Sequence, residues 1–176
     1  MIVGIMSDTH GNRRLMHRIA ETMVHDHHVD LIVHLGDNFD DAEELLMAGY
    51  AVDRVPGLWC AEYRTGRIPK SMIRELDGLR VAWAHAEQDL PAKARKADIL
   101  FTGHTHHPVV EKKGAAIHLN PGHLISGSSR GAQPSYGLVH IAADHVRVAI
   151  VDIGGRVFVE RRFARSLQAR RERPSR

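Results

Sequence analysis

Residues 1–12 read MIVGIMSDTHGN, an apolar segment that runs directly into Asp8-Thr9-His10. Six residues that can be buried precede the polar triplet, which favours a buried β-strand ending at a carboxylate and an imidazole. Residues i and i+2 of an extended chain point to the same side, so Asp8 and His10 can approach one cation if the extended geometry continues past Ser7. Because an Asp-x-His triplet is common by chance, the metal-site hypothesis depends on whether later strands end similarly.

Length and composition indicate a single α/β domain. The chain has 176 residues, of which 43% are hydrophobic and only 5% aromatic, as in an aliphatic core. No stretch approaches the ~20 apolar residues of a membrane span, and no basic segment precedes a signal-peptide core, so we expect a cytoplasmic protein without membrane contact. Cys60 is the only cysteine, which excludes an intrachain disulfide and a thiolate metal cluster.

Positive charge is concentrated at the C-terminus. The whole chain has a net charge of +3, and residues 165–176 contribute +4 through five arginines and one glutamate, so the rest carries −1. We therefore expect a domain over residues 1–164, followed by an Arg-rich, disordered tail over residues 165–176. A nearly neutral domain also argues against strong nucleic-acid binding. The oligomeric state cannot be read from the sequence.

Alternating strands and helices are predicted for the first third of the chain. Apolar residues from Leu15 to Met23 recur at helical spacing, and Asn12 stands where an N-cap residue is expected. A buried strand at residues 31–35, a short helix and a strand at residues 51–55 follow. This order predicts a parallel sheet with right-handed crossovers, in which ligands gather beyond the carboxyl ends of the strands.

The second half is rich in predicted strands. Residues 72–76 and 79–84 flank Asp77-Gly78, a dipeptide that supplies the positive φ angles of a tight hairpin turn. A short helix at residues 91–96 leads to a strand at residues 99–102, and the remaining chain reads as short strands separated by glycine or aspartate turns. We therefore expect two packed sheets with helices on the outside.

Ligand-type side chains recur where these predicted strands end. The set consists of Asp8, His10, Asp37, His85, His104 and His106. Oxygen and nitrogen ligands without sulfur suit Mn, Fe, Ni, Co or Zn better than Ca or Mg, which prefer all-oxygen shells. Six ligands are too many for one tetrahedral site and fit two cations that share a carboxylate, for which we favour Asp37.

In this order, the motifs resemble those of the calcineurin-like metallophosphoesterases, specifically the small bacterial and archaeal phosphodiesterase branch. The motifs are Asp8-Thr9-His10, Gly36-Asp37, Gly57, His85, Gly103-His104-Thr105-His106 and Asn120-Pro121-Gly122. The resemblance extends from Met1 to about Arg162. It implies an α/β fold of the four-layer α-β-β-α type, in which two packed mixed sheets are flanked by helices.

The same resemblance implies a metal-dependent phosphodiesterase that acts on a small phosphate ester. Two divalent transition metal ions, most often Mn, would activate a hydroxide for direct attack on phosphorus at a dinuclear centre. By the resemblance, the first metal would be held by Asp8, His10, Asp37 and His106. The second would be held by Asp37, His85, His104 and an asparagine that follows Gly57.

That asparagine is replaced in this chain by Leu58, which cannot coordinate a metal. The second site therefore lacks one ligand, and Cys60 or Glu62 are the nearby side chains that could substitute for it. The departure leaves an alternative open: a catalytically weakened or inactive scaffold or binding protein with this fold, like the retromer subunit that resembles the family. Six retained ligand-type residues favour catalysis over this alternative.

Three further polar residues are candidates for contacting a substrate phosphate: Asn12, Asn38 and Arg130. Each also has an ordinary explanation, because asparagine next to glycine favours tight turns and Arg130 lies in a loop rich in glycine and serine. A metallo-β-lactamase fold would also use clustered histidine and aspartate. Its His-x-His-x-Asp-His run is missing, since residues 103–107 contain no aspartate. The sequence does not identify the natural substrate.

Overall fold

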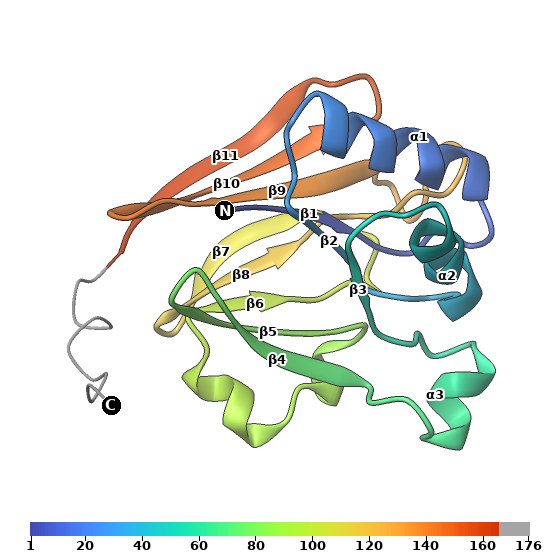
Figure 1. The fold of residues 1–176 in the computed structure, drawn as a ribbon, viewed down its shortest axis with the longest axis horizontal. Helices are drawn as coiled ribbons and strands as arrows, with labels where there is room; N and C mark the ends of the chain where they lie inside the picture. Colours follow the sequence, from blue (N-terminus) through green and yellow to red (C-terminus); the bar gives the residue numbers. More distant parts are fainter. Residues whose placement is uncertain (166–176) are drawn as a thin grey trace.

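The computed structural model describes residues 1–165 and consists of two β-sheets packed face to face with helices on their outer sides (Figure 1). The first sheet is formed, in spatial order, by β11 (Val157–Ala164), β10 (His145–Asp152), β9 (Ser135–Ile141), β1 (Ile2–Met6), β2 (Leu31–His34) and β3 (Val52–Arg54). The second is formed by β4 (Ser71–Leu76), β5 (Leu79–Ala84), β6 (Ile99–Phe101), β8 (Ala116–Asn120) and β7 (Val109–Lys113).

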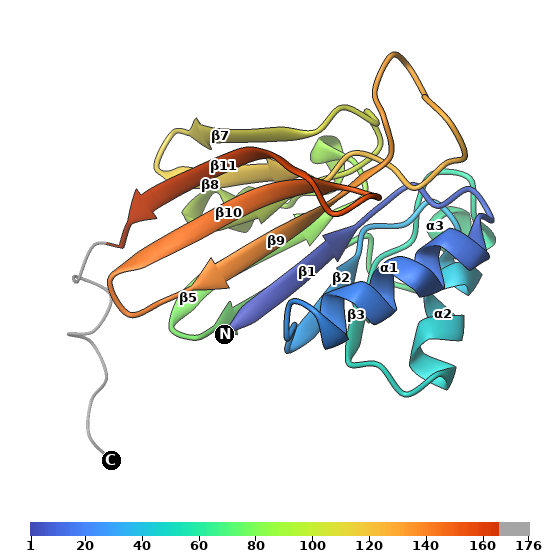
Figure 2. The same cartoon turned by 90° about the horizontal axis from the view of Figure 1, so that it is seen from above.

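The first sheet combines a parallel half with an antiparallel half. β1, β2 and β3 pair in parallel, and they are joined by helices α1 (Arg13–His25) and α2 (Phe39–Met47), as the sequence predicted. Figure 2 shows β9, β10 and β11 continuing the sheet beyond β1 as an antiparallel meander. The sheet is therefore mixed, and its parallel strands bring their carboxyl ends to one edge of the molecule.

The second sheet begins with the predicted hairpin. β4 and β5 are antiparallel, and Asp77 and Gly78 in the turn have φ angles of 47° and 76°. β5, β6 and β8 are parallel to one another, so their carboxyl ends also share one edge. The short helices here are η1 (Glu87–Asp89), η2 (Ala92–Lys96) and α3 (Ala61–Thr65), the last of which the sequence pattern had not indicated.

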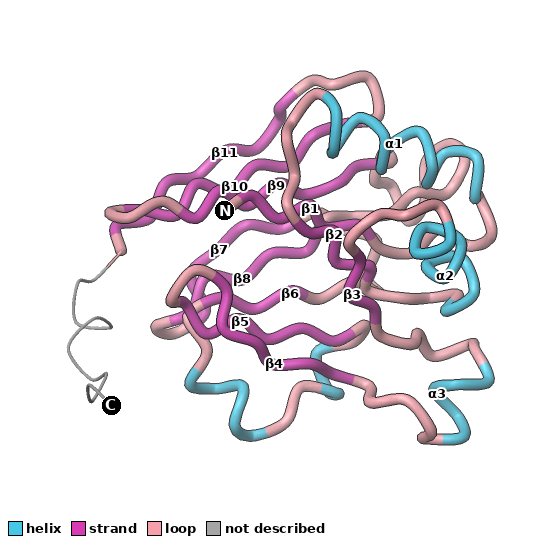
Figure 3. Tube along the Cα trace, in the orientation of Figure 1, coloured by secondary structure: helices cyan, strands magenta, loops and turns pink. Residues whose placement is uncertain are grey.

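Apolar side chains fill three layers between these elements. The largest cluster lies between the two sheets, where Trp83 and Phe101 stack with ring centroids 6.4 Å apart. A second cluster packs α1 and α2 against the first sheet, and a small one packs η2 against the second sheet. Figure 3 shows the strands as two central groups with the helices outside them. The expectation of an α/β fold with two packed mixed sheets flanked by helices is confirmed.

The chain after β11 is described only as far as Arg165. The guanidinium of this residue donates to the carbonyl oxygen of Ala142 at 2.9 Å, which holds it against the β9–β10 turn. The remainder of the predicted Arg-rich tail, residues 166–176, lies outside the described residues. Among residues 1–165, no helix is both long and apolar enough to cross a membrane.

His34 is a buried imidazole at the end of β2, on the same side of the strand as Ile32. Its Nδ1 accepts a hydrogen bond from the backbone N–H of Gly36 at 3.2 Å, so the proton of the neutral ring is on Nε2, which has no hydrogen-bond partner. Burial lowers the pKa of His34 from 6.5 to about 4, although Asp41 and Asp8 oppose this shift.

We predict that His34 makes the fold sensitive to acid. Between pH 6.5 and about 4 the unfolded chain binds a proton at His34 that the folded chain does not. The free energy of unfolding therefore falls by about 3 kcal/mol across this range on account of this one group. His34→Asn keeps an acceptor near the Nδ1 position and removes the titration. Urea unfolding in EDTA at several pH values measures the free energy of unfolding as the pH falls. This free energy should fall less steeply for His34→Asn than for the parent protein, and an equally steep fall in both proteins would contradict the prediction.

Candidate metal centre

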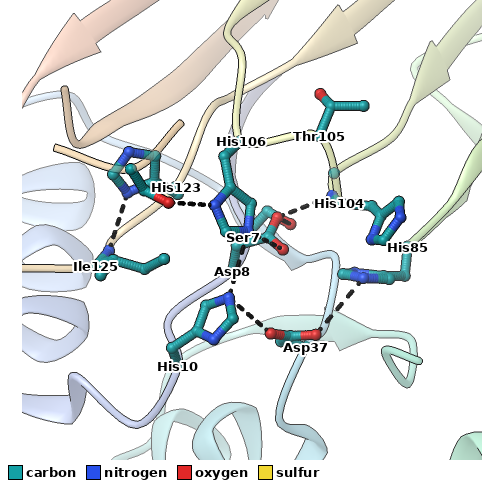
Figure 4. A network of polar contacts seen from close by, with 12 residues as sticks. Ser7, Asp8, His10, Asp37, His85, His104, Thr105, His106, His123 and Ile125 are labelled. Carbon is teal, nitrogen blue, oxygen red and sulfur yellow. Dashed lines mark hydrogen bonds and ion pairs between the residues drawn. The ribbon is translucent and has the colours of Figure 1, made fainter. Parts of the chain in front are cut away.

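Four strand ends meet at one edge of the sheet sandwich, two from each sheet. Asp8 follows β1, Asp37 follows β2, His85 follows β5, and the segment 103–107 follows β6. Figure 4 shows the side chains from these segments pointing toward one another. The sequence prediction that ligand-type residues gather beyond the strands therefore agrees with the fold.

Asp8 is the most completely enclosed carboxylate of the cluster, with 1% of its surface exposed. Its Oδ2 accepts hydrogen bonds from the Ser7 hydroxyl at 2.5 Å and the His104 backbone N–H at 2.9 Å, and its Oδ1 lies 3.2 Å from His106 Nε2. Burial raises the pKa of Asp8, but the hydrogen-bonding contact with His106, the neighbouring His85 imidazole and the Ser7 hydroxyl outweigh it. The pKa therefore lies below its ordinary value, and Asp8 is ionised.

Asp37 lies between imidazoles that come from different sheets. Its Oδ2 is 2.8 Å from His10 Nε2, and its Oδ1 is 3.6 Å from His85 Nε2. Burial raises the pKa of Asp37, and the nearby negative charge of Asp8 adds to the rise, although His10 opposes it. Asp8 and Asp37 have donor atoms within 4.8 Å of each other. Their mutual repulsion is relieved when positive charge is bound between them.

The His85 ring is held by one of its nitrogen atoms and turns the other toward Asp37. His85 Nδ1 donates to the backbone carbonyl of Leu35 at 2.8 Å, so in the neutral ring the lone pair is on Nε2. That Nε2 atom is fully buried, has no hydrogen-bond partner and faces Asp37. A carbonyl bonded to one ring nitrogen, with the other nitrogen free, is the arrangement that orients metal-binding histidines.

His10 and His106 form the other side of the cluster. Their Nε2 atoms are only 3.3 Å apart, with the rings nearly perpendicular, and the Nδ1 of His106 lies 2.7 Å from the Ser129 hydroxyl. Two imidazole nitrogens and two carboxylates thus converge on a small volume. This donor set fits a divalent transition metal by its chemistry.

Within residues 1–165, two groups of side chains have donor atoms close enough to share a cation. One consists of Asp8, His10 and His106, and the other of Asp8, Asp37 and His85. Asp8 belongs to both groups, a role that the sequence analysis had given to Asp37. His104 belongs to neither group in this structure, but its ring centroid is 5.2 Å from that of His85.

The local backbone differs from the expected extended geometry. β1 ends at Met6, and Asp8 and His10 have φ angles of 52° and 47°, in the left-handed region. His104 and His106 repeat this feature with φ angles of 66° and 65°. The condition that strand geometry continues past Ser7 is therefore not met, and a turn, not an extended strand, brings Asp8 and His10 into one group with His106. Strained backbone of this kind often accompanies functional sites, because the surrounding structure must hold it in place.

Two glycines allow the loops of the centre to approach one another. A Cβ atom at Gly57 would overlap the backbone of Asp37, and one at Gly103 would overlap the Ser7 side chain and lie 2.9 Å from Asp8 Oδ2. Gly57 therefore brings the following loop directly against Asp37. Leu58, the first residue of that loop, is half-buried.

Neither proposed substitute for the missing asparagine lies in the two groups of potential ligands. The Cys60 thiol donates to the backbone carbonyl of Gly57 at 3.1 Å, so it is turned toward its own loop. Glu62 lies in the first turn of α3. Cys60 and Glu62 therefore add no ligand to either group.

The three candidates for substrate contact have different surroundings. Asn12 occupies the predicted N-cap position of α1, but its side chain makes no capping hydrogen bond. Its side-chain amide donates to the Leu124 carbonyl at 2.9 Å instead. Asn38 precedes α2 and also makes no capping hydrogen bond. Arg130 is exposed, and its Nη1 donates to the backbone carbonyl of His104 at 3.1 Å, next to the cluster.

Two residues that the site prediction did not include support this arrangement. Asp41 is fully buried and accepts hydrogen bonds from the Thr9 hydroxyl, the Gly11 N–H and the Arg13 guanidinium, which fixes the loop carrying His10. His123 packs its ring 5.3 Å from that of His106 and bonds the loop backbone through both nitrogens. His123 directly follows the Asn120-Pro121-Gly122 motif, and this position indicates that it lies near the site. No local sequence pattern distinguishes Asp41 from an ordinary acidic residue in the first turn of a helix.

Sequence comparison places relatives of this chain among phosphoesterases. The family model for the calcineurin-like phosphoesterase superfamily domain matches residues 1–144. A "Probable metallophosphoesterase" of Methanothermobacter thermautotrophicus is 29% identical over 97% of this chain and 100% of its own length. The phosphodiesterase YfcE of Escherichia coli is 42% identical over 52 residues, which are 30% of this chain and 27% of that protein.

Solved structures share the fold. The crystal structure of YfcE superposes with a TM-score of 0.68 and 23% identity, covering 91% of this chain and 98% of the other. Vacuolar Protein Sorting 29 from Cryptosporidium parvum superposes with a TM-score of 0.71 and 22% identity, covering 93% and 98%. The family-model match extends from β1 through the centre to β9. This chain therefore belongs to the calcineurin-like phosphoesterase superfamily, a family of metal-dependent enzymes that act on phosphate esters.

Proposed function

We propose that this protein is a metal-dependent phosphodiesterase with a dinuclear centre formed by Asp8, His10, Asp37, His85, His104 and His106. The buried Nε2 atom of His85 is the observation that carries the proposal, since it faces Asp37 without a partner while Nδ1 is fixed by Leu35. A buried nitrogen lone pair beside two carboxylates is costly unless it binds a cation. The family membership supports the same reading.

Two divalent transition metal ions, with Mn the first candidate, would supply a hydroxide near neutral pH and positive charge for the phosphoryl oxygens. Asp8 and Asp37 would anchor these ions, because together they contact imidazoles from both sides of the cluster. The His104 N–H holds Asp8 in orientation, and Ser129 does the same for His106. No serine or cysteine nucleophile is required by this reaction.

Arg130 is the best placed of the three candidates for binding substrate phosphate. Its guanidinium is exposed and already lies against the His104 carbonyl, at the rim of the cluster. Arginine suits this role because its planar donors match phosphate oxygens. The Asn12 amide, by contrast, is occupied by its hydrogen bond to Leu124. Asn38 is half-buried at the start of α2, where its side chain makes no capping hydrogen bond.

A scaffold or binding function is the second candidate. Leu58 favours it, because the second metal site would have only Asp37, His85 and His104 as ligands, and the fold resembles that of Vacuolar Protein Sorting 29. The number of metal ions per purified chain separates the two candidates. At saturating Mn²⁺ we expect two ions per chain for the catalytic protein, and one or none for a scaffold that had lost its chemistry.

Alanine at His104 tests the catalytic assignment. Removing this imidazole should weaken the second metal and lower the rate of bis(p-nitrophenyl) phosphate hydrolysis in excess Mn²⁺ by about 100-fold. His107→Ala is the matched control, because His107 is an exposed histidine of the same segment whose Nδ1 bonds the backbone carbonyl of Thr105 in its own turn. Equal rates for His104→Ala and the parent protein would disprove the assignment.

Asparagine at Leu58 tests whether the second site lacks a ligand. Leu58→Asn should bind the second Mn²⁺ about tenfold more tightly than the parent, because an amide oxygen would be added next to Asp37. Leu58→Ala is the control, since it removes the leucine without supplying a ligand. Calorimetric titration of metal into the metal-free proteins measures the affinity. If the asparagine and alanine variants bind the second metal equally, the explanation based on ligand number is refuted.

A further inference from the structure

A cavity of about 400 Å³ lies between the start of α1 and the loop that joins β8 to β9. Figure 2 shows this loop projecting at the same end of the molecule as the start of α1. The residues that matter for its chemistry are Asn12, Arg14, Leu15, Arg18, Ile125 and Pro134. None of these residues belongs to the proposed metal centre.

The cavity is nevertheless a direct neighbour of that centre. Asn12 in its wall follows His10 by two residues and donates to the carbonyl of Leu124 at 2.9 Å, and the N–H of Leu124 donates to the Asp8 carbonyl at 3.2 Å. Farther along the same loop, Ser129 contacts His106. The cavity therefore adjoins the centre through two chain segments, the turn after β1 and the loop between β8 and β9.

The charge of the cavity is positive and uncompensated. Arg14 and Arg18 lie one helical turn apart on α1, and no acidic side chain lines the cavity. Their neighbour Arg13 forms ion pairs with Asp41 and Glu44 of α2, whereas no ion pair between residues 1–165 includes Arg14 or Arg18. Like charges at this spacing destabilise a helix, and an anion bound between them would remove the repulsion.

The rest of the wall is largely apolar. Leu15, Ile125, Pro134 and Ile153 contribute hydrocarbon surface next to the two guanidinium groups. Such a surface combined with two exposed guanidinium groups suits an organic group that is apolar in its body and negatively charged at one position. An inorganic anion alone would leave the apolar wall without a partner.

A phosphodiester has two organic arms, and the metal centre needs to hold only the phosphate between them. We propose that the cavity binds one arm of the substrate, an apolar arm that carries its own anionic group, and that Arg14 and Arg18 determine this specificity. The proposal depends on the phosphodiesterase function proposed above. It defines the substrate class as a diester with a second negative charge on one arm.

Binding of two matched nucleotides tests the cavity without any catalytic turnover. Thymidine 3′,5′-bisphosphate should bind the purified protein about tenfold more tightly than thymidine 5′-monophosphate, and Arg14→Gln/Arg18→Gln should abolish this preference. Lys93→Gln/Lys96→Gln removes the same charge from exposed sites in η2 and should keep the preference. Calorimetry measures the six affinities of the parent and the two double variants for the two nucleotides, and thermal unfolding checks that each variant is folded. The same preference in both double variants would overturn the proposal.

Hydrolysis separates failure of this inference from failure of the proposed function. The substrates are thymidine 5′-(p-nitrophenyl phosphate) and its 3′-phosphorylated form, each with Mn²⁺. The parent protein should have the higher kcat/KM for the 3′-phosphorylated diester, and Arg14→Gln/Arg18→Gln should lower that ratio about tenfold. Hydrolysis with an unchanged ratio in this variant would refute the cavity alone. The phosphodiesterase function alone would be refuted if the parent protein hydrolysed neither diester. In that case the parent protein would still show the binding preference, and Arg14→Gln/Arg18→Gln would lack it.

Discussion

Two buried carboxylates at the junction of the sheets, Asp8 and Asp37, are the constraint on which the centre depends. Each is at most 2% exposed, so each has lost most of its hydration. Removing ionised groups from water is expensive unless hydrogen bonds and opposite charges replace the solvent. The Ser7 hydroxyl, the His104 N–H and the surrounding imidazoles provide that replacement in part. Cations bound between the two carboxylates would replace the rest of the lost hydration. The stability of the buried carboxylates and the proposed chemistry therefore both favour cations at this position.

The fold meets this constraint by combining two sheets. Parallel strands in each sheet end at the same edge, and packing the sheets face to face brings the ends of β1 and β2 opposite those of β5 and β6. The final approach depends on turns rather than strands, as the positive φ angles of Asp8 and His104 show. Gly57 and Gly103 remove the side chains that would keep these turns apart. The rigid core between the sheets then maintains a geometry that no single loop could hold.

Much of this arrangement could be predicted from the sequence because its signals are local. Hydrophobic periodicity identified β1, α1 and the hairpin at Asp77, and the polar residues after buried strands identified the cluster. Hydrogen bonds between distant segments could not be predicted in the same way. Asn12 resembles a helix cap, yet its amide bonds Leu124, 112 residues away, and Asp41 resembles an ordinary first-turn acid, yet it fixes Thr9. Such roles depend on tertiary neighbours that the local sequence does not specify.

The energetic cost of burying His85 differs in meaning between a catalytic protein and a scaffold. A scaffold uses its surface, and nothing in that role requires a buried imidazole whose Nε2 has no partner. Leaving such a group unsatisfied costs about 1–3 kcal/mol, a sizeable part of the stability of a small domain. In His85 this cost accompanies a tautomer fixed by Leu35 and a lone pair facing Asp37. The Nε2 of His34 is also buried without a partner, so the missing partner alone does not assign a metal. The position of His85 Nε2, 3.6 Å from Asp37 Oδ1, favours a function in which that nitrogen binds a cation.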